Sequence, residues 1–209
     1  MSTSDRIKSF ARSVGYEPTP FQWESLERYA NLVVEWNRAI NLVRFRNQEE
    51  LWIRHILEPL ILLPSLHART FVDIGAGAGF MSIPVAICRP DIDVIGLESA
   101  PKRAAFLARV VRELQLPYRL VRDRFERWIP SKTLEDTLVV ARAFPSWEKV
   151  LPPLLRRSEP GASIALFVGE DWETRVASFL PFWTVSLVMP MPEKTSSFVV
   201  FLGNVSRET

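Results

Sequence analysis

The chain has 209 residues, 47% hydrophobic residues and a formal net charge of +2, which indicates one folded domain of medium size and excludes a disordered chain. So small a net charge does not by itself indicate nucleic-acid binding, and the single cysteine, Cys88, excludes both an internal disulfide and a cysteine metal cluster. Residues 1–15 are polar and no apolar run is long enough to span a membrane, so we expect a cytoplasmic protein without a signal peptide.

The first third of the chain has the pattern of helices. Residues 19–22 form a capping-box pattern with proline at the first helical position, and apolar residues then recur at intervals of three and four. A second helical stretch is predicted from about residue 49 to residue 63, with Pro59 expected to kink or shorten it. We therefore expect a helical extension over residues 1–66 and the main domain over residues 67–209.

Short apolar runs then alternate with helical patterns. Strands are predicted at 70–75, 91–98, 118–121, 138–141 and 163–168, and helices at 80–89, from Pro101 onward, at 147–157 and at 171–179. Pro160-Gly161 predicts a turn, and residues 184–188 and 198–202 are typical of an antiparallel pair. This order predicts an α/β fold: a doubly wound, mostly parallel, seven-stranded Rossmann-like sheet.

A glycine-rich loop follows the first predicted strand, with the sequence Asp73-Ile74-Gly75-Ala76-Gly77-Ala78-Gly79. A strand, a tight turn and a helix bring main-chain N–H groups against a ligand. A dinucleotide site requires glycine where this chain has Phe80, so the loop favours S-adenosylmethionine over a nicotinamide cofactor. Glu98, at the end of the second predicted strand, is placed to accept hydrogen bonds from both ribose hydroxyls of an adenosine. The sequence therefore predicts a methyltransferase.

Several further motifs occur in a fixed order along the chain. They are Asn41-Leu42, the block from Arg54 to Leu60, the loop up to Phe80, Ile83-Pro84, Lys102-Arg103-x-x-Phe106-Leu107 and Ala141-Arg142-Ala143-Phe144. In this set, which covers about residues 20–170, the chain resembles the bacterial small-subunit ribosomal RNA guanine-N7 methyltransferases, the family also called glucose-inhibited division protein B. The resemblance implies methyl transfer from S-adenosylmethionine to N7 of a guanine in 16S ribosomal RNA, free or in the small ribosomal subunit, by a monomer.

The loop and the resemblance together imply where the cofactor binds. Phe80 would close over its methionine part, and residues 125–126 would flank its adenine. Arg142, at the end of the fourth predicted strand, would hold the cofactor carboxylate or an RNA phosphate, and is the one candidate for positioning. The predicted cofactor-binding set is Gly75, Gly77, Phe80, Glu98, Ser99, Ala100, Phe125, Glu126 and Arg142.

Basic residues cluster locally despite the small net charge. The candidates for RNA binding are Arg44, Arg46, Arg54, Lys102 and Arg103. Further arginines, which ordinary solvated surfaces explain equally well, are Arg109, Arg112, Arg119, Arg122, Arg124 and Arg127. The tryptophans Trp23, Trp36, Trp52 and Trp147 lie in helical patterns and are interpreted as core residues.

Guanine N7 has a free lone pair, so its methylation releases no proton and requires no general base. No catalytic acid–base residue and no metal site are expected, and His55 is interpreted as structural. Two positions depart from the family pattern: Val168 stands where the family has lysine, and Thr195-Ser196-Ser197 where it has Arg-His. Both departures remove positive charge from the RNA side. They leave two alternatives open, a methyltransferase for a small molecule or protein and a non-catalytic RNA-binding relative.

Overall fold

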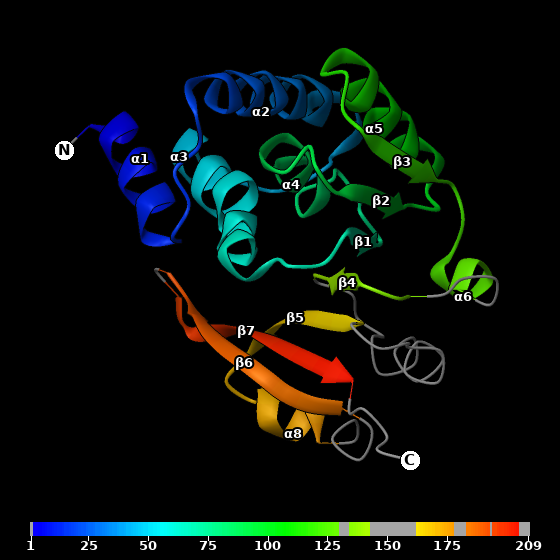
Figure 1. Cartoon of the computed structure of the whole chain (residues 1–209). Helices are drawn as coiled ribbons and strands as arrows, with labels where there is room; N and C mark the ends of the chain where they lie inside the picture. The colour runs from blue at the N-terminus through cyan, green and yellow to red at the C-terminus, as the bar shows by residue number, and fades with distance from the viewer. Residues whose placement is uncertain (1, 130–133, 143–161, 178–182, 193, 205–209) are drawn as a thin grey trace.

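A seven-stranded sheet in the order β3-β2-β1-β4-β5-β7-β6 runs through the centre of the molecule (Figure 1). The computed structural model describes residues 2–129, 134–142, 162–177, 183–192 and 194–204. The parallel strands are β1 (Thr70–Ile74), β2 (Asp93–Leu97), β3 (Tyr118–Val121), β4 (Thr137–Ala141) and β5 (Ser163–Gly169). Strand β7 (Lys194–Asn204) pairs antiparallel with β5 and with β6 (Trp183–Met191). The predicted doubly wound, mostly parallel sheet is confirmed.

The N-terminal helices begin where their capping residues predict. Helix α2 (Pro20–Ile40) starts at Thr19, whose hydroxyl accepts the N–H of Gln22 while the Gln22 side chain accepts the N–H of Thr19. It ends at Asn41, which adopts a left-handed conformation with φ 47°. Helix α1 (Thr3–Ser13) has its own capping box at its start, although its polar sequence did not indicate a separate helix.

The second predicted helical stretch is helical but changes type along its length. It begins as α3 (Gln48–Leu51), continues as a π-helix, η1 (Trp52–Leu57), and ends as a 3-10 helix, η2 (Glu58–Ser65). Pro59 has no N–H to donate, so the α-helical ladder cannot continue through it. At Pro59 the helix is therefore not broken, and its hydrogen-bond pattern changes from that of a π-helix to that of a 3-10 helix. None of the helices in the described residues is long and apolar enough to cross a membrane.

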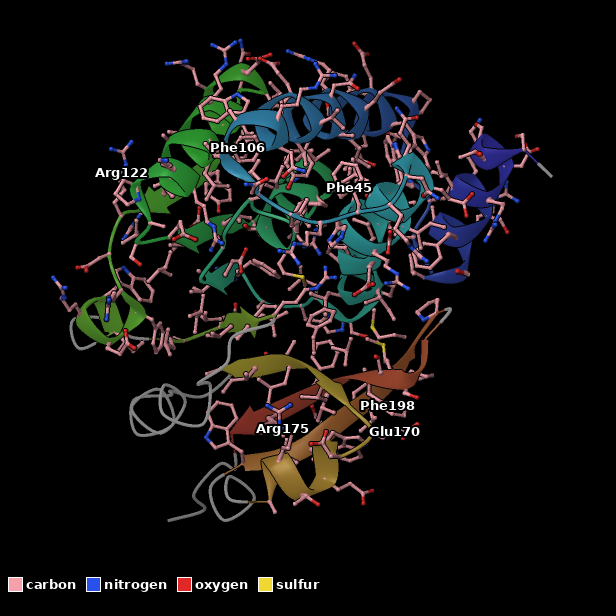
Figure 2. All side chains as sticks on the ribbon, turned by 180° about the vertical axis from the view of Figure 1, so that it is seen from behind. Phe45, Phe106, Arg122, Glu170, Arg175 and Phe198 are labelled. Carbon is pink, nitrogen blue, oxygen red and sulfur yellow. The ribbon has the colours of Figure 1, made fainter. Side chains whose placement is uncertain are left out.

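Helices cover both faces of the sheet, and alternate strand residues point to opposite faces (Figures 1 and 2). Phe71 of β1 lies in a core shared with the N-terminal helices, α4 (Ser82–Cys88) and α5 (Pro101–Glu113). The neighbouring Val72 lies in a second core with α6 (Phe125–Trp128) and α8 (Trp172–Val176). The five predicted parallel strands are confirmed to within a few residues. The helix predicted at 147–157 and the turn at 160–161 lie outside the described residues.

The N-terminal helices share a continuous hydrophobic core with the sheet. The first core contains Phe10 of α1, Leu26 of α2 and Ile56 of η1 together with Phe201 of β7. Burying each such side chain contributes about 1.5–3 kcal/mol. The N-terminal helices are therefore held firmly against the rest of the domain.

Candidate cofactor site at the carboxyl edge of the sheet

The glycine loop turns sharply at three positions. Gly75, Gly77 and Gly79 have φ angles of 69°, 61° and 81°, in the left-handed region that favours glycine. The N–H of Ala76 donates to the carbonyl of Leu97 at 2.9 Å, and the N–H of Gly79 donates to the carbonyl of Ala76 at 2.7 Å. The loop is thereby fixed to the end of β2 as it leaves β1.

The glycines at 77 and 79 are required for different reasons. A Cβ on Gly79 would lie 2.5 Å from Cγ1 of Ile83 and 2.6 Å from Cδ2 of Leu107, so this glycine lets the loop pack against α4 and α5. A Cβ on Gly77 would meet nothing closer than the Gly75 carbonyl oxygen, at 3.8 Å. Gly77 is therefore required by its φ alone, and the space beside it is open to a ligand.

Glu98 joins the loop to the start of α5. Its carboxylate accepts the N–H of Gly77 at 2.8 Å and the N–H of Ala100 at 2.7 Å, and the residue is 5% exposed. Each carboxylate oxygen has a second lone pair, so these bonds leave acceptor capacity for a ligand hydroxyl. Ser99 is exposed beside it, and Ala100 is the N-cap residue of α5. The fold thus brings together five of the predicted site residues: Gly75, Gly77, Glu98, Ser99 and Ala100.

A buried polar network lies beneath the loop, and the sequence pattern did not indicate it. The Ser82 hydroxyl donates to the Asp73 carboxylate at 2.6 Å, and the Ser82 and Tyr118 hydroxyls lie 2.9 Å apart. Burial raises the pKa of Asp73 to about 7, against the lowering effect of the Ser82 hydrogen bonds. A Cβ on Gly96 would overlap the Tyr118 hydroxyl, so a glycine in β2 makes room for the network.

Aromatic side chains line the loop on the side of the N-terminal helices. Phe80, half-buried, has its ring centroid 4.8 Å from that of His55 and 6.3 Å from that of Tyr29. The Tyr29 hydroxyl donates to the carbonyl of Ala78 at 2.9 Å, which fixes α2 to the loop. Phe80 therefore lies between the loop and the helices that cover it.

Arg142, directly after β4, is engaged by the π-helical segment. Its Nη2 donates to the Arg54 carbonyl at 2.8 Å and lies 3.1 Å from Oε1 of Glu58, whose side chain is 4% exposed. The Glu58 N–H donates to the Ile53 carbonyl, and the next N–H along would belong to Pro59. The Arg54 carbonyl therefore has no main-chain donor in this register, and the guanidinium of Arg142 donates to it instead. The Arg142 side chain is 20% exposed, so it is not fully enclosed by these contacts.

The remaining predicted residues lie in three different environments. Phe125 is 3% exposed and packs against Trp128 with ring centroids 6.4 Å apart, whereas Glu126 is exposed. Phe125 is therefore a core side chain, so its main chain and not its ring is left to flank an adenine. Val168 is 7% exposed within the second core, so its difference from the family lysine changes packing as well as charge. Residues 195–197 lie in β7.

The predicted RNA-binding residues form two groups. Arg46 and Arg54 both pair with Glu50, with N–O distances of 3.0 and 3.2 Å, and Arg44 is exposed nearby. Lys102 and Arg103 are exposed in the first turn of α5. Glu50 therefore offsets part of the positive charge of the first group. The second group lies at the start of α5, one of the two helices against which the glycine loop packs.

The site has no reactive thiol. Burial raises the pKa of Cys88 to about 12, so the thiol is protonated at neutral pH. The described residues also contain no group of histidine, cysteine and carboxylate side chains arranged to hold a metal ion.

Comparisons with known proteins agree with this architecture. The sequence model of the family described as rRNA small subunit methyltransferase G, GidB, matches residues 22–189. The ribosomal RNA small subunit methyltransferase G of Nitrosomonas europaea is 40% identical over 148 residues, which cover 71% of this chain and 69% of that protein. The protein of the same name from Sodalis glossinidius is 33% identical over 205 residues, which cover 95% and 98%.

Two solved structures have the same fold at low sequence identity. A SAM-dependent methyltransferase from Aquifex aeolicus superimposes with a TM-score of 0.58 and 17% identity, over 76% of this chain and 94% of that one. The O-methyltransferase TomG from Streptomyces achromogenes, solved in complex with SAM, gives a TM-score of 0.58 and 16% identity over 87% and 90%. At these identities the likeness establishes the fold alone.

Proposed function

The chain belongs to the rRNA small subunit methyltransferase G family, and from this membership we propose that it transfers the methyl group of S-adenosylmethionine to N7 of a guanine in 16S ribosomal RNA. One structural observation carries the proposal. The carboxylate of Glu98 holds the N–H of Gly77 at 2.8 Å, beside a position where the loop has open space. An acceptor for ribose and a loop open to a ligand thus meet at the carboxyl edge of the sheet.

The residues at this edge fit S-adenosylmethionine. Glu98 would accept the ribose hydroxyls, the main chain at Gly75 and Gly77 would contact the methionine part, and Phe80 would cover it. Arg142 would act through Glu58 and the Arg54 carbonyl, by holding the π-helical segment over the site, and with its exposed part would reach the cofactor carboxylate. When bound, the cofactor supplies an electrophilic methyl group on its sulfonium.

The protein's contribution to the reaction is positioning. Guanine N7 already carries a lone pair, so no side chain has to remove a proton. Asp73 and Glu98 are both buried and both accept hydrogen bonds from the protein, which suits a structural and binding role. We further propose that residues 1–66 form an extension that closes the site, and that residues 67–209 carry out methyl transfer. Shielding the reacting atoms from water by Phe80 and the covering helices would complete the site.

Calorimetry tests the cofactor, with Gly77→Ala as the decisive variant. A methyl group at 77 costs about 1–2 kcal/mol through its φ, leaves the packing intact and occupies the open space. We expect the wild-type chain to bind S-adenosylmethionine and folded Gly77→Ala to bind it at least tenfold more weakly. Absence of S-adenosylmethionine binding by folded wild-type protein would reject the cofactor assignment.

Radiolabelled methyl transfer tests the substrate. Small ribosomal subunits from a strain that lacks the gene are incubated with the protein and labelled S-adenosylmethionine, and the RNA is then cleaved chemically at N7-methylguanine. We expect label at one guanine of the small-subunit RNA. Label that goes only to a protein or small molecule in a cell extract would replace the RNA assignment with the alternative substrate classes.

A further inference from the structure

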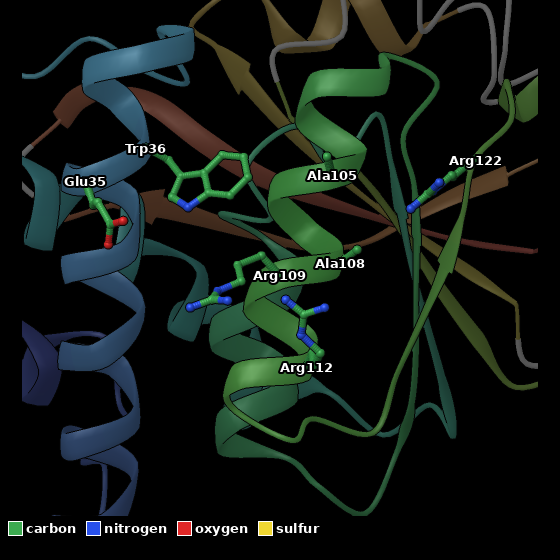
Figure 3. A pocket seen from close by; sticks show the side chains of 7 residues that line it. All are labelled: Glu35, Trp36, Ala105, Ala108, Arg109, Arg112 and Arg122. Atoms are coloured by element: carbon green, nitrogen blue, oxygen red, sulfur yellow. The ribbon is translucent and has the colours of Figure 1, made fainter.

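A hollow of about 530 Å³ lies beside α5, between α2 and the residue that follows β3 (Figure 3). We call it the α5 hollow. Trp36 of α2 forms one side, Arg109 and Arg112 project from α5, and Arg122, which follows β3, forms the other side. Three elements that are distant in the sequence therefore form a single surface, and none of its lining residues belongs to the cofactor site described above.

Small and rigid residues create the space. Ala105 and Ala108 of α5 line the hollow where longer side chains would fill it. Trp36 is half-buried, and its ring centroid lies 5.6 Å from that of the fully buried Phe106. The hollow is therefore built from regular helices and a fixed aromatic side chain, and its shape exists before any ligand arrives.

Positive charge dominates the lining. The lining contains three guanidinium groups and a single carboxylate, that of Glu35. Arg109 is paired with Glu113 at 2.6 Å. Within the described parts of the chain, Arg112 and Arg122 make no ion pair or side-chain hydrogen bond, and both are exposed. Guanidinium groups bind phosphate oxygens through several N–H donors at once, so two uncommitted arginines suit a phosphate ligand.

The hollow is connected to the predicted cofactor edge. The N–H of Glu98 donates to the carbonyl of Val121 at 3.0 Å, and Arg122 is the next residue. Helix α5 begins at Pro101, so at a rise of 1.5 Å per residue Arg109 and Arg112 lie about 12–16 Å along the helix from its start. Stacked nucleotides advance about 3.4 Å each, so this distance corresponds to about four or five nucleotides.

We propose that the α5 hollow binds the phosphodiester backbone of the RNA substrate, a few nucleotides away from the base that enters the methyl-transfer site. This proposal rests on the proposed function. The exposed Lys102 and Arg103 lie in the first turn of the same helix, between the predicted cofactor edge and the hollow, and add positive charge there. Exposed cations around an open hollow suit the phosphates of a nucleic-acid strand, and the Trp36 ring and the two alanines give the hollow an apolar lining beside them.

The test is the double variant Arg112→Gln with Arg122→Gln. Both side chains are exposed and unpaired among the described residues, so the fold should be unaffected. The matched control is Arg12→Gln with Arg69→Gln, which removes the same charge from side chains that are 63% and 90% exposed elsewhere. Binding of small ribosomal subunits that lack the methylation is measured over a series of salt concentrations, with calorimetry for S-adenosylmethionine.

We expect the double variant to bind subunits at least about tenfold more weakly than the control, with the slope of log K against log salt reduced by about 2. Its affinity for S-adenosylmethionine and its rate at saturating subunits should stay unchanged. Subunit affinity and salt slope equal to those of the control would overturn the proposal. Equal loss of binding to polyglutamate would also overturn it, because the hollow would then be a general anion site. A wild-type chain that binds S-adenosylmethionine but neither binds nor methylates subunits would reject the proposed function itself.

Discussion

Replacing Glu98 with glutamine tests how the cofactor site is held together. Both carboxylate oxygens accept a main-chain N–H, from Gly77 at 2.8 Å and from Ala100 at 2.7 Å. In either orientation the amide NH₂ of a glutamine would face one of these donors. A hydrogen bond to a charged group contributes about 1.5–3 kcal/mol. The variant loses one such bond and weakens the other, so the free energy of unfolding should fall by about 2–4 kcal/mol.

Thermal unfolding and calorimetry measure the two consequences separately. For a chain of this size each kcal/mol lowers Tm by about 2–4 °C, so Glu98→Gln should melt about 5–15 °C below the wild type. The loss of a charged acceptor should also weaken S-adenosylmethionine binding by about 10- to 100-fold, measured well below the variant's Tm. The exposed Glu126, changed to glutamine, is the matched control for stability. A Tm within about 1 °C of the wild type would refute the stabilising role of the two hydrogen bonds to Glu98, and an unchanged Kd for S-adenosylmethionine would refute its ribose role.

Three further outcomes follow from the packing and charges of the site. Gly79→Ala should lower the free energy of unfolding by about 2–4 kcal/mol, because residue 79 has a left-handed φ and the new Cβ would overlap the side chains of Ile83 and Leu107. An unchanged midpoint of urea unfolding, Cm, would contradict this. The pKa of Asp73 is raised to about 7 in the folded protein, so the contribution of its protonation to stability is fully present below about pH 4 and is lost as pH rises to about 7. In Asp73→Asn this slope of the free energy of unfolding against pH, at most about 1.4 kcal/mol per pH unit, should be absent. Curves of the free energy of unfolding against pH that run parallel for the two proteins would contradict this role of Asp73. Arg142→Met should destabilise by about 3 kcal/mol, because it removes the ion pair of the buried Glu58 carboxylate with Arg142, and adding Glu58→Gln should recover part of the loss; a double variant whose loss in the urea midpoint equals the sum of the two single losses would exclude the coupling.

The sequence predicts those parts of the fold that are set locally. Periodicity places the parallel strands, and Thr19 and Gln22 place the start of α2, because a strand's alternation and a helix cap depend on neighbouring residues. The change from α to π to 3-10 helix over residues 48–65 could not be predicted. Pro59 indicates only that the helix is interrupted, and the side chain that hydrogen-bonds the Arg54 carbonyl, Arg142, lies 88 residues away in the sequence.

The same division applies to the candidate site. The topology of an α/β sheet places Glu98 beside the glycine loop, because the carboxyl ends of adjacent parallel strands meet at one edge. Contacts between side chains on different strands and helices were not predictable, since they depend on sheet register. Tyr118 reaches Ser82 across 36 residues, and space for it exists only because residue 96 is glycine. The engagement of Arg142 with Glu58 could not be read from the motif that contains either residue.

The capped carbonyl of Arg54 also has a consequence for the order of folding during synthesis. The π-helical segment emerges from the ribosome early, but its cap at position 142 is translated only after about two thirds of the 209 residues. Until then the carbonyl is hydrated, and the segment lacks its hydrogen bond and ion pair with Arg142. Nascent chains arrested before residue 142 should therefore expose this segment to proteases and chaperones, and chains arrested well after it should protect the segment.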